Sequence, residues 1–359
     1  MDFANRPIGT AAVGYGYWGP NVVRNIVSCP EFRLVSLCEP RFERLSDFGR
    51  RNPTVELTDS FDSVLVDDRV EAVAIATPPH THFDLVSRAL QAGKHVLVEK
   101  PLADTPEQAL ALVELAEAND LVLLPGHTFL YSPPVNAVRD LVCNGTLGKA
   151  FFVTSSRLNL GPYREYGVIW DLAPHDISIL MHVFGERITE VRAVAVSVYR
   201  EDAPETAFLT FRLANGVAAN VEMSCLAPRK VRDMVIVGSE RMIQYEDTAA
   251  ENPVRIYDRG MDFDTPADYG EYRLTYRTGD MVAPVVEAAE PLALELQDFA
   301  RAIQTGETPV ASARLGLEVV RVVEAAQASL RIGGSPVAVP EVPQEQSSEP
   351  SADLAPASL

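Results

Sequence analysis

The most constraining feature of the sequence lies near its amino terminus, where glycines follow an apolar run. Gly14-x-Gly16-x-x-Gly19 comes directly after Ile8–Val13, and Pro20 stands next. The first glycine permits a tight turn, the second lets a ligand approach the backbone, and the third lets a helix pack closely against the strand. Proline is tolerated in the first turn of a helix, because the N–H that it lacks would have no partner there. The segment therefore predicts a strand, a tight turn and a helix whose amino terminus faces an anionic ligand.

The first part of the chain alternates between short apolar runs and helical patterns. The runs are uniformly apolar, as expected of strands buried on both faces. They are Ile8–Val13, Leu34–Cys38, Ala72–Ala76, His95–Val98 and Leu121–Leu124. The helical patterns between them are Pro20–Val27, Arg41–Arg51, Asp62–Val66, Phe83–Ala92, Pro106–Ala118 and Pro134–Cys143. This alternation predicts an α/β domain over residues 1–146, a Rossmann doubly wound parallel sheet with right-handed crossovers.

An acidic residue, Glu39, stands where the second predicted strand ends, twenty residues beyond the last glycine of the motif. A carboxylate in this place accepts hydrogen bonds from the hydroxyls of an adenosine ribose and repels a 2′-phosphate. The glycine motif and Glu39 are thus predicted to bind a dinucleotide, with NAD favoured. Arg41 and Arg44 follow and can pair with a phosphate, so NADP stays possible. The alternative is a glycine turn that opens a helix without any ligand.

After Leu147 the pattern changes to consecutive β-rich segments. These are Phe151–Arg157, Val191–Tyr199, Ala207–Leu213, Val217–Cys225 and Val231–Val237, with helices at Asp171–Phe184, Leu292–Gln304 and Ala313–Leu330. Short turns between strands predict an α+β domain with a large open antiparallel sheet over residues 147–334. The acidic stretch Glu246–Asp298 is interpreted as a solvated face and loops. Residues 335–359 are rich in Pro, Ser and Glu and are expected to form a disordered tail.

Composition excludes several classes of partner. Lys and Arg total 31 and Asp and Glu total 50, a formal charge of −19, which disfavours nucleic acid and membrane surfaces. Cys29, Cys38, Cys143 and Cys225 lack the spacing of a zinc site, so no metal is expected. Neither a signal-peptide pattern nor an apolar window of about 18 residues occurs. We expect a cytoplasmic protein with reduced thiols.

Lysine is rare, at only four positions, and Lys100 follows Glu99 at the end of a predicted strand. Open parallel sheets bind ligands at that edge, and a lysine can exchange a proton, which arginine cannot. The residues four before the lysines are Leu90, Val96, Gly145 and Leu226, so the Tyr-Lys arrangement of short-chain dehydrogenases is excluded. A solvated lysine at a strand end is the alternative interpretation.

A second candidate is the pair Asp171 and His175, which are four residues apart and therefore on one helical face. A histidine can take the proton of an alcohol, and a neighbouring carboxylate is expected to raise its pKa and orient it. The alternative is that Asp171 caps a helix and His175 is a surface histidine. His80-x-His82 is interpreted as a helix cap or cofactor contact, not a metal site.

Taken together, these motifs resemble the glucose–fructose oxidoreductase / inositol dehydrogenase / MocA family. The similar features span about residues 8 to 185: the glycine motif, Thr77-Pro78 with His82, Glu99-Lys100-Pro101, and Asp171-x-x-x-His175. The resemblance implies NAD(P)-dependent oxidation or reduction at a carbon of a sugar or cyclitol, bound between the nucleotide domain and the antiparallel sheet. It also implies that His175 is the acid/base, that Lys100 polarises the reacting oxygen, and that Asp171 is a substrate ligand. Thr77, His82 and Glu99 are expected to line the cofactor.

Within that family, Gly16-Tyr17-Trp18-Gly19-Pro20-Asn21 and Trp170–Asp176 are most similar to the branch acting on nucleotide-linked sugars, including UDP-N-acetylglucosamine 3-dehydrogenases. Tyr17 and Trp18 are accordingly expected at the cofactor. Arg157, Asn159 and Arg164 are expected to contact the substrate, since arginine binds phosphate bidentately, although solvated arginines fit equally well. This branch often carries another residue at position 171, so free sugars and inositols stay open.

The leading hypothesis is an NAD-dependent oxidoreductase acting on a secondary alcohol of a sugar, with a nucleotide-linked sugar favoured. Alternatives are an NADP(H)-dependent ketoreductase of a deoxysugar intermediate, an inositol or free-sugar dehydrogenase, and a dinucleotide-sensing regulatory module without chemistry. A homodimer or homotetramer is expected, because the second face of an open antiparallel sheet needs cover.

Overall fold

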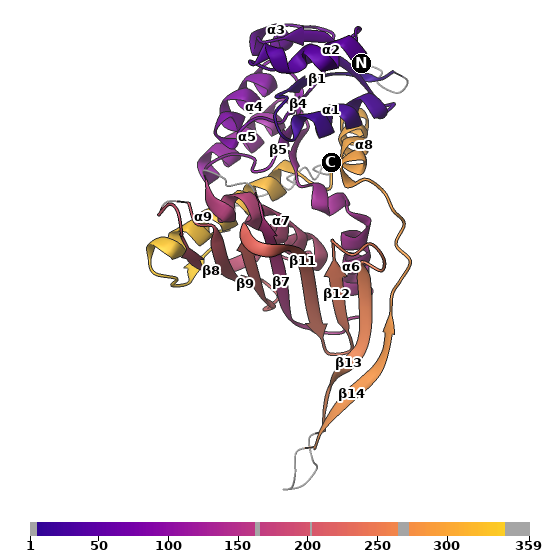
Figure 1. Cartoon of the computed structure of the whole chain (residues 1–359), viewed down its shortest axis with the longest axis vertical. Helices are drawn as coiled ribbons and strands as arrows, with labels where there is room; N and C mark the ends of the chain where they lie inside the picture. Colours follow the sequence, from indigo (N-terminus) through magenta and orange to yellow (C-terminus); the bar gives the residue numbers. More distant parts are fainter. Residues whose placement is uncertain (1–5, 162–165, 202, 265–272, 342–359) are drawn as a thin grey trace, which may run out of the picture.

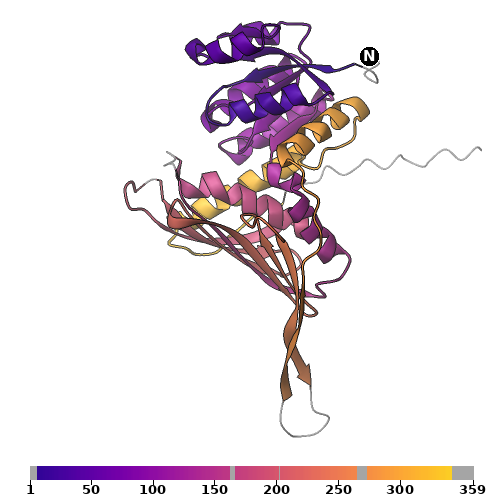
Figure 2. The same ribbon diagram turned by 45° about the vertical axis from the view of Figure 1, so that its right-hand side comes forward.

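A computed structural model describes residues 6–161, 166–201, 203–264 and 273–341. Two sheets, one above the other in Figures 1 and 2, are separated by helices. None of the described helices has the length and apolar character needed to cross a membrane.

The first sheet has six parallel strands in the order β3-β2-β1-β4-β5-β6. The strands are β1 Ile8–Val13, β2 Phe32–Cys38, β3 Glu56–Thr58, β4 Ala72–Ile75, β5 His95–Glu99 and β6 Leu123–Gly126. The helices are α1 Gly19–Ser28, α2 Ser46–Arg51, α3 Phe61–Leu65, α4 His82–Gln91, α5 Pro106–Ala118 and α6 Pro133–Cys143, with 3₁₀ turns η1 Phe42–Leu45, η2 Pro79–Thr81 and η3 Thr128–Tyr131. The Rossmann prediction is confirmed.

Side chains alternate across this sheet into two apolar layers. Ile8 and Ala12 of β1 pack in one layer with α1, and Ala11 and Val13 pack in the other with α4 and α5. Because both layers are buried, every residue of β1 is buried, which explains why this strand reads as a continuous apolar run.

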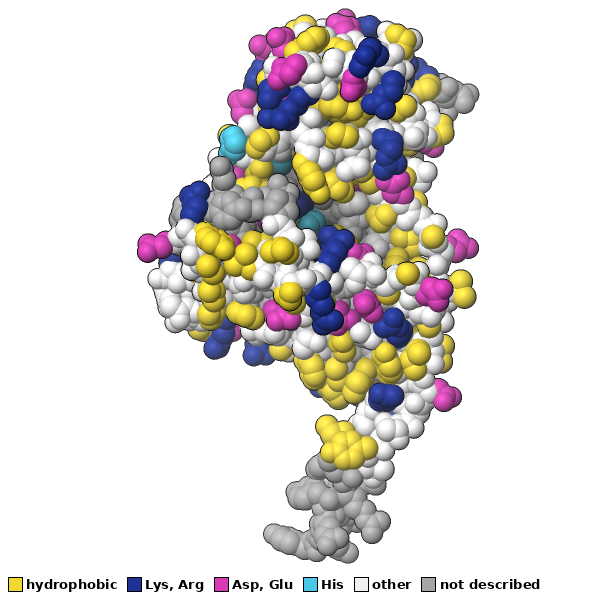
Figure 3. Space-filling view, viewed as in Figure 1, with side chains coloured by type: hydrophobic (Ala, Val, Ile, Leu, Met, Phe, Trp, Pro, Cys, Tyr) yellow, Lys and Arg dark blue, Asp and Glu magenta, His cyan; other side chains and the backbone are white. Residues whose placement is uncertain are grey.

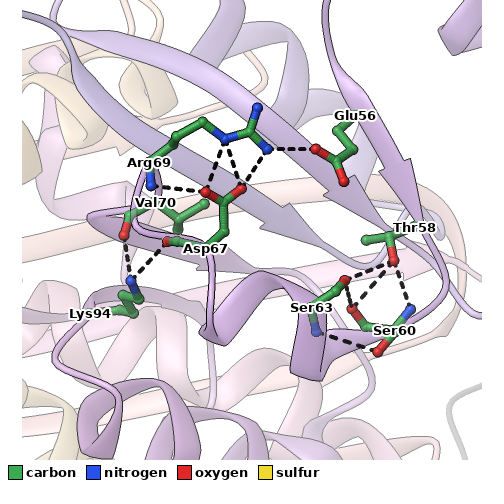
Figure 4. Close-up of polar contacts among 8 residues, drawn as sticks. All are labelled: Glu56, Thr58, Ser60, Ser63, Asp67, Arg69, Val70 and Lys94. Atoms are coloured by element: carbon green, nitrogen blue, oxygen red, sulfur yellow. Dashed lines mark hydrogen bonds and ion pairs between the residues drawn. The ribbon is translucent and has the colours of Figure 1, made fainter.

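The sequence gives no signal for β3, a strand of three residues at the edge of the sheet. Ion pairs support it, since Arg69 lies 2.7 Å from Asp67 and 2.5 Å from Glu56 (Figure 4). Lys94 Nζ donates hydrogen bonds to the carbonyl oxygens of Asp67, at 3.1 Å, and Val70, at 2.7 Å. Lys94 therefore stabilises this edge of the sheet and takes no part in the site described below.

The second sheet has nine strands in the order β14-β13-β12-β11-β7-β10-β9-β8-β15. They are β7 Ala150–Leu160, β8 Ile188–Val196, β9 Thr206–Leu213, β10 Ala218–Ser224, β11 Leu226–Gly238, β12 Met242–Glu246, β13 Val254–Asp264, β14 Arg273–Val282 and β15 Val337–Ala338. Among these strands β7 and β10 are paired in parallel, whereas the other pairs are antiparallel. The predicted sheet is thus confirmed, with one parallel pair at its centre.

The interpretation of Glu246–Asp298 as loops is wrong. β13 and β14 pair over eight registered positions and extend away from the body as a long arm (Figures 1 and 2). Met261 and Tyr276 on this arm are exposed. Apolar and polar residues alternate at Met261–Asp264 and at Leu274–Arg277, and the interpretation from acidic composition overlooked this signal.

The carboxyl-terminal helices join the two halves. α8, Pro291–Thr305, packs on the first sheet, where the Phe299 ring stacks on Phe32 with centroids 6.0 Å apart. α9, Ala313–Arg331, contributes Val320 to a core of the first sheet and Val319 to that of the second. Assigning α8 to the second domain was therefore wrong, because its apolar face is buried against the first.

The expected tail also starts too early. β15 pairs with β8, and Val339 is only 4% exposed, so Val337–Val339 pack against the second sheet. The remainder of the predicted tail, 342–359, lies outside the described residues.

Truncating Phe299 to alanine tests the assignment of α8. The ring is fully buried, so we expect Phe299→Ala to lower the free energy of unfolding by about 3–5 kcal/mol. Chemical denaturation measures this loss, with Val285→Ala as the matched control, because Val285 is 98% exposed. A loss in Phe299→Ala no larger than in the control would contradict the packing.

Candidate functional site

A cleft of about 1360 Å³ runs from the carboxyl ends of the parallel strands to the ends of strands in the second sheet. The space-filling view shows a hollow between the upper and lower halves, with histidine and basic side chains visible at it (Figure 3). Both halves line the cleft: Gly14, Gly16, Glu39, Thr77, Glu99 and Lys100 come from the first, and Asn159, Asp171, His175 and Arg232 from the second. The structure thus brings together residues that lie far apart in the sequence.

The glycine loop has the geometry that the motif predicts. Gly14 has φ +92°, and a Cβ there would lie 2.6 Å from the Ala76 carbonyl oxygen. A Cβ on Gly19 would lie 2.2 Å from the carbonyl oxygen of Gly14, so this residue lets α1 approach the turn. A Cβ on Gly16 would meet nothing within 4 Å and Gly16 lines the cleft, so open room lies where a pyrophosphate would approach the backbone.

Glu39 is 3% exposed and lines the same cleft. Its Oε2 accepts a hydrogen bond from the Tyr15 backbone N–H at 2.8 Å, and its Oε1 accepts one from Arg41 Nε at 2.9 Å. Burial alone would raise the pKa of Glu39, but these hydrogen bonds outweigh it and hold the pKa below its usual value. A fixed, ionised carboxylate therefore stands at the place expected for the adenosine ribose.

Five further residues were expected at the cofactor, and four of them are found at the cleft. Tyr17, Trp18, Thr77 and Glu99 line the cleft. His82 is fully buried, with one ring nitrogen 2.8 Å from the Pro101 carbonyl oxygen and the other 3.0 Å from that of Thr77. The expectation that His82 lines the cofactor is wrong, because both of its ring nitrogens are within hydrogen-bond distance of backbone carbonyl groups. These contacts join the turn after β4 to the turn after β5.

Lys100 and Asp171 connect the two halves of the cleft. Lys100 Nζ donates to the backbone carbonyl of Asp171 at 2.5 Å and to its Oδ1 at 3.2 Å. Asp171 lies in α7, Gly167–Phe184, which begins before the predicted start, so Asp171 is in the helix interior and does not cap it. His175 follows one turn later on the same face.

His175 is surrounded by cations and an aromatic ring. Its ring meets the Phe129 ring edge-on with centroids 5.0 Å apart. Burial lowers the pKa of His175 well below its usual value, and the charges of Lys100, Arg157 and Arg232 lower it further. The expectation that a carboxylate raises this pKa is wrong, because Asp171 is engaged by Lys100. The imidazole is consequently neutral at physiological pH and able to accept a proton.

The three residues expected to contact the substrate have different outcomes. Asn159 lines the cleft. Arg157 is 6% exposed, its Nε donates to Asp176 Oδ2 at 2.7 Å, and its guanidinium lies 4.7 Å from the Phe129 ring centre. The expectation of a substrate contact for Arg157 is therefore wrong, because the buried pair with Asp176 occupies it. Arg164 lies outside the described residues.

Behind Lys100 lies a buried polar cluster that sequence reasoning missed apart from Glu99. Burial raises the pKa of Glu99 to about 7 and that of Glu295 well above its usual value, while it lowers the pKa of His127 to about 3. Thr128 Oγ1 donates to Glu295 Oε2 at 2.9 Å. His127 is thus neutral at pH 7. It follows β6, whereas Glu295 belongs to α8, and no local motif reveals that these two elements lie close together.

Arg232 was also missed. It lines the cleft, pairs with Asp247 at 2.8 Å, and lies 5.6 Å from the Phe129 ring centre, opposite a histidine that the sequence did single out. The Phe129 ring is therefore in contact with two guanidinium groups and with the His175 ring. In the sequence Phe129 stands out only as an aromatic residue just after the fifth buried run, which is insufficient to assign it a role.

The fold and the cleft define a Rossmann-type, dinucleotide-dependent oxidoreductase with a second sheet domain. The sequence model described as "Oxidoreductase family, NAD-binding Rossmann fold" matches residues 8–127, and the GFO/IDH/MocA C-terminal domain matches residues 135–244. The chain belongs to the GFO/IDH/MocA family and binds NAD through its first domain.

Two curated relatives and one solved structure are similar to this chain. UDP-N-acetylglucosamine 3-dehydrogenase of Acidithiobacillus ferrooxidans is 33% identical over 206 residues, which span 56% of this chain and 62% of that enzyme. scyllo-Inositol 2-dehydrogenase (NAD(+)) of Bacillus subtilis is 26% identical, covering 86% of this chain and 91% of that one. Levoglucosan dehydrogenase, solved with NADH and L-sorbose, shares the fold at TM-score 0.79 and 20% identity, covering 94% of this chain and all of that one.

Two alanine substitutions in the glycine loop separate binding from stability. Gly16→Ala places its methyl group in open space, so stability is unchanged while NADH affinity falls about tenfold or more, about 1.4 kcal/mol. Gly19→Ala places a methyl group against the Gly14 carbonyl and should cost about 1–3 kcal/mol of stability. Fluorescence titration with NADH and thermal melting measure the two effects. Normal NADH affinity in Gly16→Ala would contradict the role of the loop.

The low pKa of His175 predicts the pH dependence of oxidation. A base must be neutral to act, so activity persists as pH falls through 6.5 and is lost only at the lowered pKa. Removing one neighbouring cation with Arg232→Gln should move this limb of the kcat/KM profile to higher pH. If the kcat/KM profile also has a limb near pH 7 and Glu99→Gln abolishes it, that limb reports the titration of Glu99. A limb at 6.5 or above that persists in Glu99→Gln would contradict the assignment to His175.

Proposed function

We propose that the protein is an NAD-dependent dehydrogenase that oxidises a secondary alcohol of a sugar, with a nucleotide-linked sugar as the favoured substrate. The observation that carries the proposal is the ion pair between Lys100 and Asp171, one helical turn from the neutral His175, in the cleft that contains the glycine loop. A regulatory module that only senses a dinucleotide has no need of a lysine, a carboxylate and a neutral base side by side.

In this proposal each catalytic residue acts on the substrate hydroxyl. His175 accepts the hydroxyl proton, while the carbon–oxygen double bond forms and Lys100 stabilises the charge that develops on the oxygen. Asp171 holds Lys100 and orients the sugar. NAD, when bound, supplies the acceptor for the hydride that leaves the same carbon. In the reverse direction His175 donates the proton to the carbonyl oxygen while Lys100 stabilises the charge on that oxygen, so the same residues serve a ketoreductase.

NAD is proposed over NADP because of Glu39. Its ionised carboxylate is fixed in the cleft by Tyr15 and would repel a 2′-phosphate. Arg41, which could otherwise attract that phosphate, is paired with Glu39. Glu99, Thr77, Tyr17 and Trp18 are proposed to line the rest of the cofactor.

A relative of this chain favours a nucleotide-linked sugar. The cleft of about 1360 Å³ takes both the dinucleotide and the sugar, so the choice of sugar rests on the relative and not on the volume. The relative with 33% identity is named for UDP-N-acetylglucosamine. The presence of Asp171 keeps free sugars and inositols in the substrate panel.

Substituting the two reacting groups tests the proposal. Lys100→Ala and His175→Ala should each lower turnover of the best sugar by roughly 10²–10⁴-fold, because each removes a group that acts on the reacting oxygen, while NADH still binds. Lys149→Ala is the matched lysine control, since Lys149 is exposed. The absorbance of reduced nicotinamide measures turnover over a panel of nucleotide-linked sugars, free sugars and inositols. Full activity in both variants would refute the assignment.

We also propose a homo-oligomer in the cytoplasm. The four cysteines are free, as in a reducing compartment. Val194 and Phe208 are neighbours on adjacent strands of the open sheet face and are 58% and 43% exposed, and hydrophobic side chains are visible over this half of the molecule (Figure 3). A second copy covering this face would bury them.

Introducing a charge on the sheet tests this assembly. Phe208→Glu is expected to shift the protein to a monomer in light scattering coupled to size-exclusion chromatography. Val66→Glu is the control, since Val66 is 79% exposed on the first domain. An unchanged mass in Phe208→Glu would place the interface elsewhere.

A further inference from the structure

A second, smaller cavity adjoins the main cleft at the second sheet. It has a volume of about 300 Å³ and is lined by Gly161, Tyr199, Arg200, Glu205, Cys225 and Leu226. Gly161 and Cys225 line both cavities, so the smaller one continues the larger. It lies beyond the ends of β7 and β10.

Glu205 is the unusual residue of this cavity. The side chain is 1% exposed, and its Oε2 accepts a hydrogen bond from the Val198 backbone N–H at 2.8 Å. The other oxygen, Oε1, is buried and has no hydrogen-bond partner. A buried carboxylate oxygen without a partner is costly, and a ligand that donates a hydrogen bond would remove that cost.

The backbone holds Glu205 in place at this cavity. The Glu205 N–H donates to the Val196 carbonyl oxygen at 3.2 Å, and the Cys225 N–H donates to the Glu205 carbonyl oxygen at 3.0 Å. Both residues are therefore tied to the strands that border the cleft. A site fixed by backbone in this way requires little reorganisation when a ligand binds.

The chemistry of the cavity selects its occupant. A carboxylate can only accept hydrogen bonds, so the matching group is a donor such as a hydroxyl or an ammonium group. Arg200 also lines the cavity, so donors and an acceptor stand side by side, which suits a hydroxyl group that can both donate and accept. Leu226 and Tyr199 add apolar surface, on which the face of a sugar ring can rest.

We propose that this cavity binds a substituent of the sugar remote from the reacting carbon, through a hydroxyl or ammonium group that donates to Glu205 Oε1. The inference rests on the proposed function, because the reacting carbon is placed in the adjoining cleft at Lys100 and His175. The diphosphate of a nucleotide-linked substrate then lies elsewhere in the main cleft. Glu205 is thus a determinant of substrate specificity.

The test couples Glu205 to single hydroxyl groups of the sugar. Isothermal titration calorimetry on the NADH-loaded protein measures binding of D-glucose and of its monodeoxy analogues, so no turnover is needed. In the wild type, removal of one particular hydroxyl should weaken binding at least tenfold. In Glu205→Ala the same removal should have no effect, since the acceptor is gone.

Two further variants make the result specific. Glu205→Gln keeps an acceptor for Val198 N–H but replaces the charged acceptor of the cavity with a neutral NH2 group, so the discrimination should become smaller, because a neutral hydrogen bond to a hydroxyl is weaker than a charge-assisted one. Leu226→Trp narrows the cavity, keeps the carboxylate and should weaken glucose binding, which covers the case in which Glu205 variants fail to fold. Melting temperature and NADH affinity report folding.

The outcomes separate this inference from the proposed function. If turnover of a sugar is found but no hydroxyl is coupled to Glu205, or glucose does not bind, the inference is overturned and the proposed function stands. If coupling is found but no sugar is oxidised with NAD, the cavity binds sugar and the proposed function fails. Absence of both binding and turnover overturns both.

Discussion

The contact between Lys100 and Asp171 is the interaction on which the organisation of the cleft depends. It joins the end of β5 in the first sheet to α7 of the second half, through a carbonyl and a carboxylate oxygen. The two side chains are only 14% and 23% exposed, so salt screens their attraction less than it would on the surface. Such a pair contributes more to alignment than to net stability, because desolvation offsets much of the Coulomb energy.

The apolar packing of α9 makes that alignment possible. Its residues belong to the cores of both sheets, and Gly316 lies close to Pro125 of β6, where a Cβ would be 2.6 Å from the proline ring. α8 packs on the first sheet through Phe299. The two halves are therefore held by burial, and the ion pair sets the register in which Lys100 meets α7. The chain's overall acidity has little influence there, because three cations face His175.

Local motifs predicted those parts of the structure that depend on local geometry. β1 and α5 have the predicted bounds, and the glycine loop has the predicted shape, since backbone sterics and burial on two faces leave a direct trace in the sequence. Lys100 was correctly placed at a strand end facing the cleft. The rest depended on long-range contacts: His82, Arg157 and Glu295 owe their roles to partners on other elements, and nothing in their own neighbourhood signals burial.

The same difference between local and long-range interactions explains the errors in the predicted domain organisation. β13 and β14 show apolar and polar alternation only over short runs such as Met261–Asp264, and the acidic composition of the whole segment outweighed it. Residues 335–341 contain two prolines, but Val337 and Ala338 pair with β8, which composition cannot reveal. The expectation that a carboxylate raises the pKa of His175 considered only spacing along one helix, whereas the cations come from β5, β7 and β11.

The central claim is that Lys100 and His175 act together on one hydroxyl at the junction of the two halves. A crystal structure of the protein with NADH and the sugar identified by turnover tests it most directly. The account predicts one sugar hydroxyl within hydrogen-bond distance of both Lys100 Nζ and the His175 ring, with its carbon facing the nicotinamide. A sugar bound in the cleft whose hydroxyls reach neither residue, or one bound outside the cleft, would contradict it.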